Sequence, residues 1–269
     1  MESIKELRVM LQTNVLGHPI LQRVPSIYLT RLLLPTPVTS IQVSVAMIVV
    51  GVSAGAVAAL GYIWAGLALI YVSLVLDAVD GEIVRYKKNY SVRGVYLDLV
   101  NHIVVFGAFF FGLTVGVSEA WSVPNIPLLI VGSLGALAMV MRRANGDLYR
   151  IIFVRPYRER PEIFKIPPHT PAAGRTEAVQ ESFSLRRFVR FLLWCAHELH
   201  EGGYLIVTLV VAYGAEVLLF GGVPHHPVLS WVIVVYAVTS CVYLAREIAS
   251  EFRLIEGRLA ALDDRFQLK

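Results

Sequence analysis

The long apolar stretches of this chain constrain its fold more than any other feature. Six of them occur within 269 residues, and a helix needs about 20 apolar residues to cross roughly 30 Å of hydrocarbon. Their ranges are 41–60, 63–76, 95–117, 126–140, 204–220 and 228–245. The second stretch is too short alone, so its helix must continue into the polar sequence that follows. The sequence therefore predicts an all-α integral membrane protein with six transmembrane helices.

Composition agrees with a membrane location. Hydrophobic residues make up 56% of the chain and charged residues 16%, whereas about a quarter of the residues are charged in soluble domains. All 24 lysines and arginines fall in the N-terminal segment, in the connections between helices two and three and between helices four and five, and in the C-terminal tail. The other three connections have none. By the positive-inside rule, both termini should face the cytoplasm.

We expect three parts along the chain. Residues 1–36 form an N-terminal amphipathic or juxtamembrane segment with a helix on the membrane surface. Residues 37–255 form the six-helix domain, including a basic, proline-containing cytoplasmic loop at about 151–185. Residues 256–269 form a cytoplasmic tail. The formal net charge of +4 suits an anionic leaflet, and we do not expect nucleic acid as a partner.

Acidic residues at helical spacing mark the junction between helices two and three. Asp77 and Asp80 are three residues apart, and Asp98 and His102 are four apart, so each pair shares one helix face. A carboxylate at the edge of a bilayer is costly and needs a bound cation or a functional partner. Hard divalent cations prefer oxygen ligands and are often completed by substrate phosphates. The spacing predicts a divalent-metal site with these four side chains as ligands.

Three further residues of this segment suit a nucleotide. Gly81 and Gly94 lie one turn from Asp77 and Asp98, and lack side chains where a nucleotide would need close approach to the backbone. Arg85 lies two turns beyond Asp77 and can reach a phosphate. We therefore expect a phosphate-containing ligand at the predicted metal site.

Residues 77–102 resemble the signature D-x2-D-G-x2-A-R-x8-G-x3-D-x3-D of the CDP-alcohol phosphatidyltransferase family. The matching positions are Asp77, Asp80, Gly81, Arg85, Gly94 and Asp98. The resemblance implies a six-helix membrane enzyme of phospholipid biosynthesis, a homodimer, with its active site facing the cytoplasm. It implies one or two Mg²⁺ or Mn²⁺ ions as cofactor, and nucleotide binding by Asp77, Gly81, Arg85 and Gly94.

The reaction that the resemblance implies is transfer of a substituted phosphate from a CDP-linked alcohol to an acceptor hydroxyl, with release of CMP. One of the two alcohols is a lipid. The basic loop favours CDP-diacylglycerol as the donor, with a small polar acceptor. At the level of the sequence two alternatives stay open: a membrane transporter that binds divalent cations, and a catalytically inactive relative that binds a CDP-lipid.

Two positions depart from the family signature. Val84 replaces an alanine, and His102 replaces the last aspartate. The resemblance implies that this aspartate is both a metal ligand and the general base in the family. Neutral imidazole is a good ligand, and its unperturbed pKa of about 6.5 suits a base near neutral pH. We therefore expect His102 and Asp98 to be the catalytic residues, although His102 brings no negative charge to the metal.

Two groups outside the signature are candidates for binding the acceptor. Arg142 and Arg143 lie at the end of helix four, and His197, His200 and Glu201 lie near the start of helix five. Positive-inside anchoring would also explain the arginines, and a solvated interfacial turn would explain the second group. On the opposite side of the membrane, Glu119 and Glu216 are expected to be plain surface residues.

Overall fold

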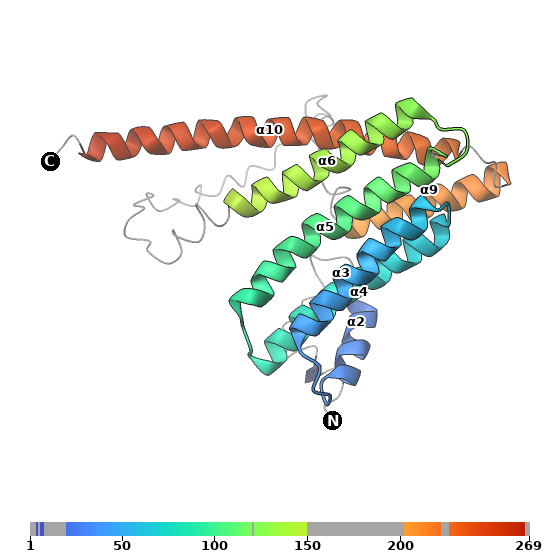
Figure 1. The fold of residues 1–269 in the computed structure, drawn as a ribbon. Helices are drawn as coiled ribbons and strands as arrows, with labels where there is room; N and C mark the ends of the chain where they lie inside the picture. The colour runs from blue at the N-terminus through green and yellow to red at the C-terminus, as the bar shows by residue number, and fades with distance from the viewer. Residues whose placement is uncertain are drawn as a thin grey trace, which may run out of the picture.

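The computed structural model describes residues 20–119, 121–149, 202–221 and 226–266, together with Ile4, Glu6 and Leu7. This part of the chain contains seven α-helices and is all-α (Figure 1). The helices are α2 (Ile20–Leu33), α3 (Ser40–Ala59), α4 (Ile63–Lys87), α5 (Val92–Val117), α6 (Ile126–Tyr149), α9 (Gly202–Phe220) and α10 (Pro227–Phe266).

Five of these helices are long and apolar enough to cross a membrane, namely α3, α4, α5, α6 and α10. The apolar part of α9, Leu205–Phe220, is shorter. The expected all-α, multi-pass membrane protein is thereby confirmed. Six spans, the sidedness of the protein and its division at residues 36 and 255 stay predictions.

Helix α4 extends beyond its apolar stretch, as its length required. It continues through Asp77 and Asp80 and ends at Lys87. The next residue, Lys88, has a left-handed backbone (φ 50°) and does not continue the helix. Three residues later Ser91 caps α5, because its side chain accepts a hydrogen bond from the Gly94 amide over 3.0 Å. The short turn between these two caps brings the polar ends of α4 and α5 together.

Helix α3 packs closely against both α4 and α5. It runs antiparallel to α4, since Ser44 contacts Asp80 and Ala58 lies against Gly66. It runs parallel to α5, since Gly51 lies against Val105 and Ala58 against Gly116. Between these contacts the backbone of Gly55 faces Gly112 so closely that a Cβ at Gly112 would overlap it. Close approach through small residues is the usual way that helices associate in a bilayer, where van der Waals packing replaces the hydrophobic effect. The three helices form one packed group in Figure 1.

Helices α6, α9 and α10 complete the bundle. Gly132 and Gly135 of α6 pack against Ile233 and Ala237 of α10, and these two helices lie side by side in Figure 1. The main core lies between the group of α3, α4 and α5 and the group of α6, α9 and α10. It includes the fully buried rings of Phe109 and Phe110. Helix α10 runs on to Phe266 without interruption, so the backbone does not break at the expected start of the tail.

Helix α2 begins at Ile20 and ends before the prolines of residues 35 and 37, in agreement with a short helix in the N-terminal segment. One face of this helix is buried in the protein and does not face a membrane surface. Ser26, Ile27 and Thr30 are all buried, and the helix packs along the polar end of α4 (Figure 1).

The expectation that Glu216 is a plain surface residue is wrong. Its side chain is fully buried in α9, accepts a hydrogen bond from the Leu229 amide over 3.0 Å, and pairs with His226 Nδ1 at 2.5 Å. Since the first amides of a helix lack partners within the helix, the Glu216 carboxylate caps α10 from a neighbouring helix. This contact depends on the tertiary fold and has no local sequence pattern.

Candidate functional site

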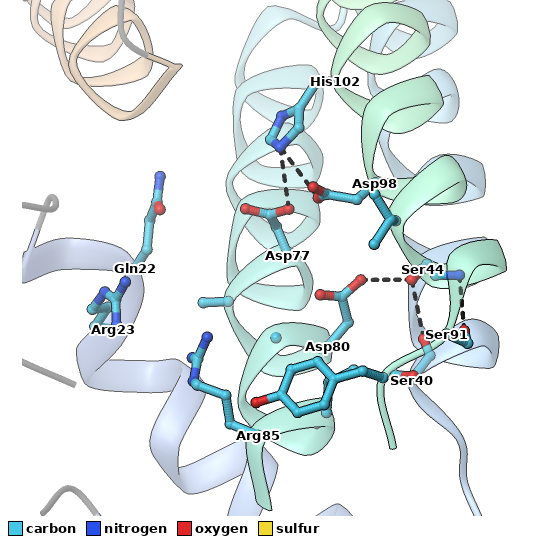
Figure 2. A pocket seen from close by; sticks show the side chains of 16 residues that line it. Gln22, Arg23, Ser40, Ser44, Asp77, Asp80, Arg85, Ser91, Asp98 and His102 are labelled. Carbon is cyan, nitrogen blue, oxygen red and sulfur yellow. Dashed lines mark hydrogen bonds and ion pairs between the residues drawn. The ribbon is translucent and has the colours of Figure 1, made fainter. Parts of the chain in front are cut away.

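A cavity of about 400 Å³ opens where four helices meet at the polar end of the bundle. It lies between the last turns of α4, the first turns of α5, the start of α3 and the start of α2 (Figure 2). Asp77, Asp80, Asp98 and His102 all line it. The four positions that the sequence suggested as metal ligands therefore border one cavity.

The imidazole of His102 lies between two carboxylates. Its Nε2 is 3.4 Å from Asp98 Oδ1 and 3.7 Å from Asp77 Oδ1, and all three side chains point toward one another in Figure 2. The side chains of His102, Asp77 and Asp98 are 18%, 26% and 49% exposed. The group is accessible from the cavity yet partly shielded from bulk water, which strengthens its interaction with a bound ion.

Asp80 points to a different partner. The Ser44 hydroxyl of α3 donates a hydrogen bond to Asp80 Oδ2 over 2.5 Å, and Figure 2 shows this carboxylate turned toward Ser44. Asp80 is consequently outside the compact group of donor atoms from Asp77, Asp98 and His102. Asp80 therefore lines the same cavity but is turned toward α3.

Gly81 and Arg85 act as a pair on the α4 side of the cavity. A Cβ built at Gly81 would lie 3.2 Å from Arg85 Nη1, so the missing side chain leaves the space in which the guanidinium rests. Gly94 also lines the cavity, beside Ser91. All four positions that the sequence suggested for a nucleotide, namely Asp77, Gly81, Arg85 and Gly94, are therefore on its wall.

Sequence reasoning missed the contribution of α2. Gln22 and Arg23 line the cavity, and Figure 2 places them on the same side as Arg85. Arg23 is close enough to Asp77 for an electrostatic interaction. No local motif marks these residues. The basic character of the N-terminal segment was a signal, but membrane anchoring accounts for it equally well.

Of the expected acceptor residues, Arg142 and Arg143 are described by the structure, and neither lines this cavity. Arg142 Nε binds Glu247 Oε1 of α10 at 2.7 Å, and its guanidinium stacks over Tyr243. Arg143 Nε is 3.6 Å from Asp147 Oδ2, although Arg143 still interacts electrostatically with Asp77, Asp98 and His102. His197, His200 and Glu201 lie outside the described residues.

The donor set fits a divalent cation. Asp77, Asp98 and His102 each offer one ligand atom, and these three atoms lie within 4.8 Å of one another. Two carboxylates and an imidazole suit Mn²⁺ as well as harder ions such as Mg²⁺, which takes few protein ligands and keeps sites for substrate oxygens. The arrangement can hold one metal ion next to a phosphate-sized space.

Residues 32–161 match the model of the CDP-alcohol phosphatidyltransferase family. Among curated protein sequences, none matches the chain. The fold is similar to crystal structures of phosphatidylinositol phosphate synthase PgsA1 from Mycobacterium tuberculosis. The apo form is 19% identical with a TM-score of 0.50, and the match covers 82% of this chain and 94% of that one.

Two liganded forms of PgsA1 are also similar. The form with CDP-DAG bound is 17% identical with a TM-score of 0.53, covering 86% of this chain and 92% of that one. The complex with manganese and citrate has the same identity and TM-score, covering 83% and 87%. At this level of identity the likeness concerns the fold.

Proposed function

Because this chain belongs to the CDP-alcohol phosphatidyltransferase family, we propose that it transfers a substituted phosphate from a CDP-linked alcohol to an acceptor hydroxyl and releases CMP. The observation that carries the proposal is the convergence of Asp77, Asp98 and His102 on one point of a cavity that also contains Gly81 and Arg85. This set combines a metal site, a phosphate-binding cation and a proton acceptor.

The carboxylates of Asp77 and Asp98 would hold a divalent metal, Mg²⁺ or Mn²⁺, with Asp80 adding negative charge from the next turn of α4. The metal would supply charge neutralisation for the donor's diphosphate. The PgsA1 structures with CDP-DAG and with manganese support the choice of ligands. We propose CDP-diacylglycerol as the donor and a small polar alcohol as the acceptor.

His102 would act as the general base. In the reaction, the acceptor oxygen forms a bond to the phosphorus that adjoins the donor alcohol, and the bond from this phosphorus to the oxygen of CMP breaks. The acceptor proton passes to His102 Nε2. The carboxylates at 3.4 and 3.7 Å would stabilise the imidazolium that forms. One nitrogen cannot bind a metal and accept a proton at once, and we assign it the second role.

Arg85, resting on Gly81, would bind a phosphate oxygen of the nucleotide, and Gly94 would leave room for its approach. Positioning and charge neutralisation are the protein's main contributions to phosphoryl transfer. The proposal also includes six membrane spans and a site that faces the cytoplasm, both from the distribution of lysine and arginine. A homodimer is proposed from the family resemblance alone.

The test is an assay of CMP release. Purified protein is incubated with Mg²⁺ or Mn²⁺, a panel of CDP-alcohols that includes CDP-diacylglycerol, and a panel of acceptor alcohols, and products are identified by lipid mass spectrometry. We expect metal-dependent CMP release for at least one pairing, matched by an equal amount of a phosphodiester product. Absence of CMP from every pairing would contradict the proposal.

A further inference from the structure

We propose that α2 forms part of the substrate site, with Arg23 binding the diphosphate of the CDP-linked donor and Glu82 positioning Arg23 by holding α2 against α4. This inference rests on the proposed function and extends it to a helix outside the family signature. Arg23 would contact the ligand, whereas Glu82, Ser26 and Thr30 would act through it.

The contact between α2 and α4 is centred on Glu82. Its side chain is fully buried, and both carboxyl oxygens accept hydrogen bonds: Oε1 from the Ser26 hydroxyl over 2.9 Å, and Oε2 from the Thr30 hydroxyl over 2.6 Å. Burying a carboxyl group is costly unless its oxygens are hydrogen-bonded. Ser26 and Thr30 are one turn apart on one face of α2, so together they fix its rotation and its position along α4.

Two further contacts hold the same helix. Ile27, 1% exposed, packs in a small apolar cluster with Leu7 and Tyr86, the latter from the last turn of α4. After α2, the Lys87 ammonium donates hydrogen bonds to the carbonyl oxygens of Thr36 and Val38 over 3.3 and 2.9 Å. Helix α2 is therefore attached to α4 along its length and beyond its C-terminal end.

This attachment determines where Arg23 lies. Gln22 is one turn before Ser26 on the same face, and Arg23 follows it directly. Both line the cavity, on the side where Arg85 lies (Figure 2). Ser26, which contacts Glu82, is three residues from Arg23, so the Glu82 contact helps to set the distance between Arg23 and Asp77.

The charges in the cavity explain why a second guanidinium is needed. Asp77, Asp80 and Asp98 line the cavity and repel a diphosphate unless cations intervene. A metal ion offsets part of this repulsion, and Arg85 offers one guanidinium. Arg23 adds another, and the planar guanidinium matches phosphate oxygens well. A diphosphate between metal and arginines is then bound by opposite charges on two sides.

The first experiment measures binding of CDP to purified protein with saturating Mn²⁺, by titration calorimetry. We expect Arg23→Ala to weaken CDP binding by about tenfold, the loss typical of one charge-assisted hydrogen bond, while Mn²⁺ affinity stays unchanged. The matched control is Arg93→Ala, which removes an exposed arginine of α5 that does not line the cavity. This control should bind CDP like the unmodified protein.

The second experiment tests the positioning role. The double variant Ser26→Ala/Thr30→Val removes both hydroxyls that contact Glu82. If they act through Arg23, this variant should also weaken CDP binding by about tenfold, and adding Arg23→Ala should cause no further loss. Thr114→Val is the control, because the Thr114 hydroxyl is equally buried but bonds to the Phe110 carbonyl within its own helix.

The outcomes separate this inference from the proposed function. If the unmodified protein does not bind CDP with Mn²⁺, the proposed function fails, and the inference with it. If it binds CDP and Arg23→Ala binds equally well, or no worse than Arg93→Ala, the inference alone is overturned. Additive losses in the triple variant would overturn the positioning role of Glu82.

Discussion

At the residue scale, His102 stands where the signature of the CDP-alcohol phosphatidyltransferase family has its last aspartate. We expect His102→Ala to lower the rate of CMP release by about 10²–10⁴-fold, the usual contribution of a general base, and to leave CDP binding largely intact. His102→Asp restores the family pattern and should retain CMP release. Stopped assays of CMP formation, combined with CDP titrations, measure both effects.

Two outcomes would decide against the base role of His102. Unchanged turnover in His102→Ala would remove this residue from the reaction. Loss of Mn²⁺ binding in the same variant would instead make the imidazole a metal ligand, the other use that its position between Asp77 and Asp98 permits.

The three aspartates should differ in their effect on metal affinity. Asp77 belongs to the compact donor group, whereas Asp80 is hydrogen-bonded to Ser44. We expect Asp77→Asn to weaken Mn²⁺ binding by more than about tenfold. Asp80→Asn should weaken it by less, because Asp80 would influence the metal through its charge without binding it directly. Mn²⁺ titrations followed by electron paramagnetic resonance would measure both, and an equal or larger effect of Asp80→Asn would contradict this order.

Residue spacing predicted much of the site and failed at identifiable positions. Asp98 and His102 meet as their spacing within one helix predicts, whereas the contact of Asp77 with this pair depends on the packing of α4 against α5. The direction of Asp80 could not be predicted, because it depends on a hydroxyl 36 positions earlier in the chain. Glu82 and Glu216 are buried for the same reason: their partners come from other helices.

At the element scale, the close contact of α3 and α5 depends on glycine. A Cβ at Gly112 would overlap the backbone of Gly55, with the Gly55 Cα 2.8 Å away. We expect Gly112→Ala to lower the free energy of unfolding by about 1–3 kcal/mol, as for other overpacked sites, because the helices must move apart. Thermal unfolding of the purified protein in detergent measures the change.

Gly146→Ala is the matched control for this helix contact. Gly146 is also inside a helix, α6, but a Cβ there would meet no atom within 4 Å. Alanine should therefore stabilise the helix by about 0.5–1 kcal/mol through its higher helix propensity. Equal effects of the two substitutions would contradict the close packing of α3 on α5.

The elements themselves were largely predictable, their contacts less so. Apolar length required α4 to continue through its aspartates, and it does so to Lys87. The apolar stretches gave no sign that α10 continues to Phe266, because that extension is polar. The packing of α2 on α4 was also unpredictable, since a basic segment with scattered apolar residues is equally typical of a membrane-surface helix.

At the scale of the whole molecule, the charge distribution predicts which end of the bundle faces the cytoplasm. Asn89 and Val123 lie beyond opposite ends of α5, and Val123 is 80% exposed. In a background with Cys195 and Cys241 replaced by serine, Asn89→Cys should react with an impermeant maleimide from the cytoplasmic side alone, and Val123→Cys from the other side alone. Labelling of both from one side would contradict the proposed topology.

The central claim is that a metal held by carboxylates of α4 and α5 contacts the diphosphate of a cytidine nucleotide. Pulsed electron–nuclear double resonance of the Mn²⁺-loaded protein with CDP tests it most directly, because ³¹P shows a strong isotropic coupling to Mn²⁺ when a phosphate oxygen is its ligand. We expect a ³¹P coupling that requires CDP and disappears in Asp77→Asn. Bound Mn²⁺ and bound CDP without any ³¹P coupling would contradict the claim.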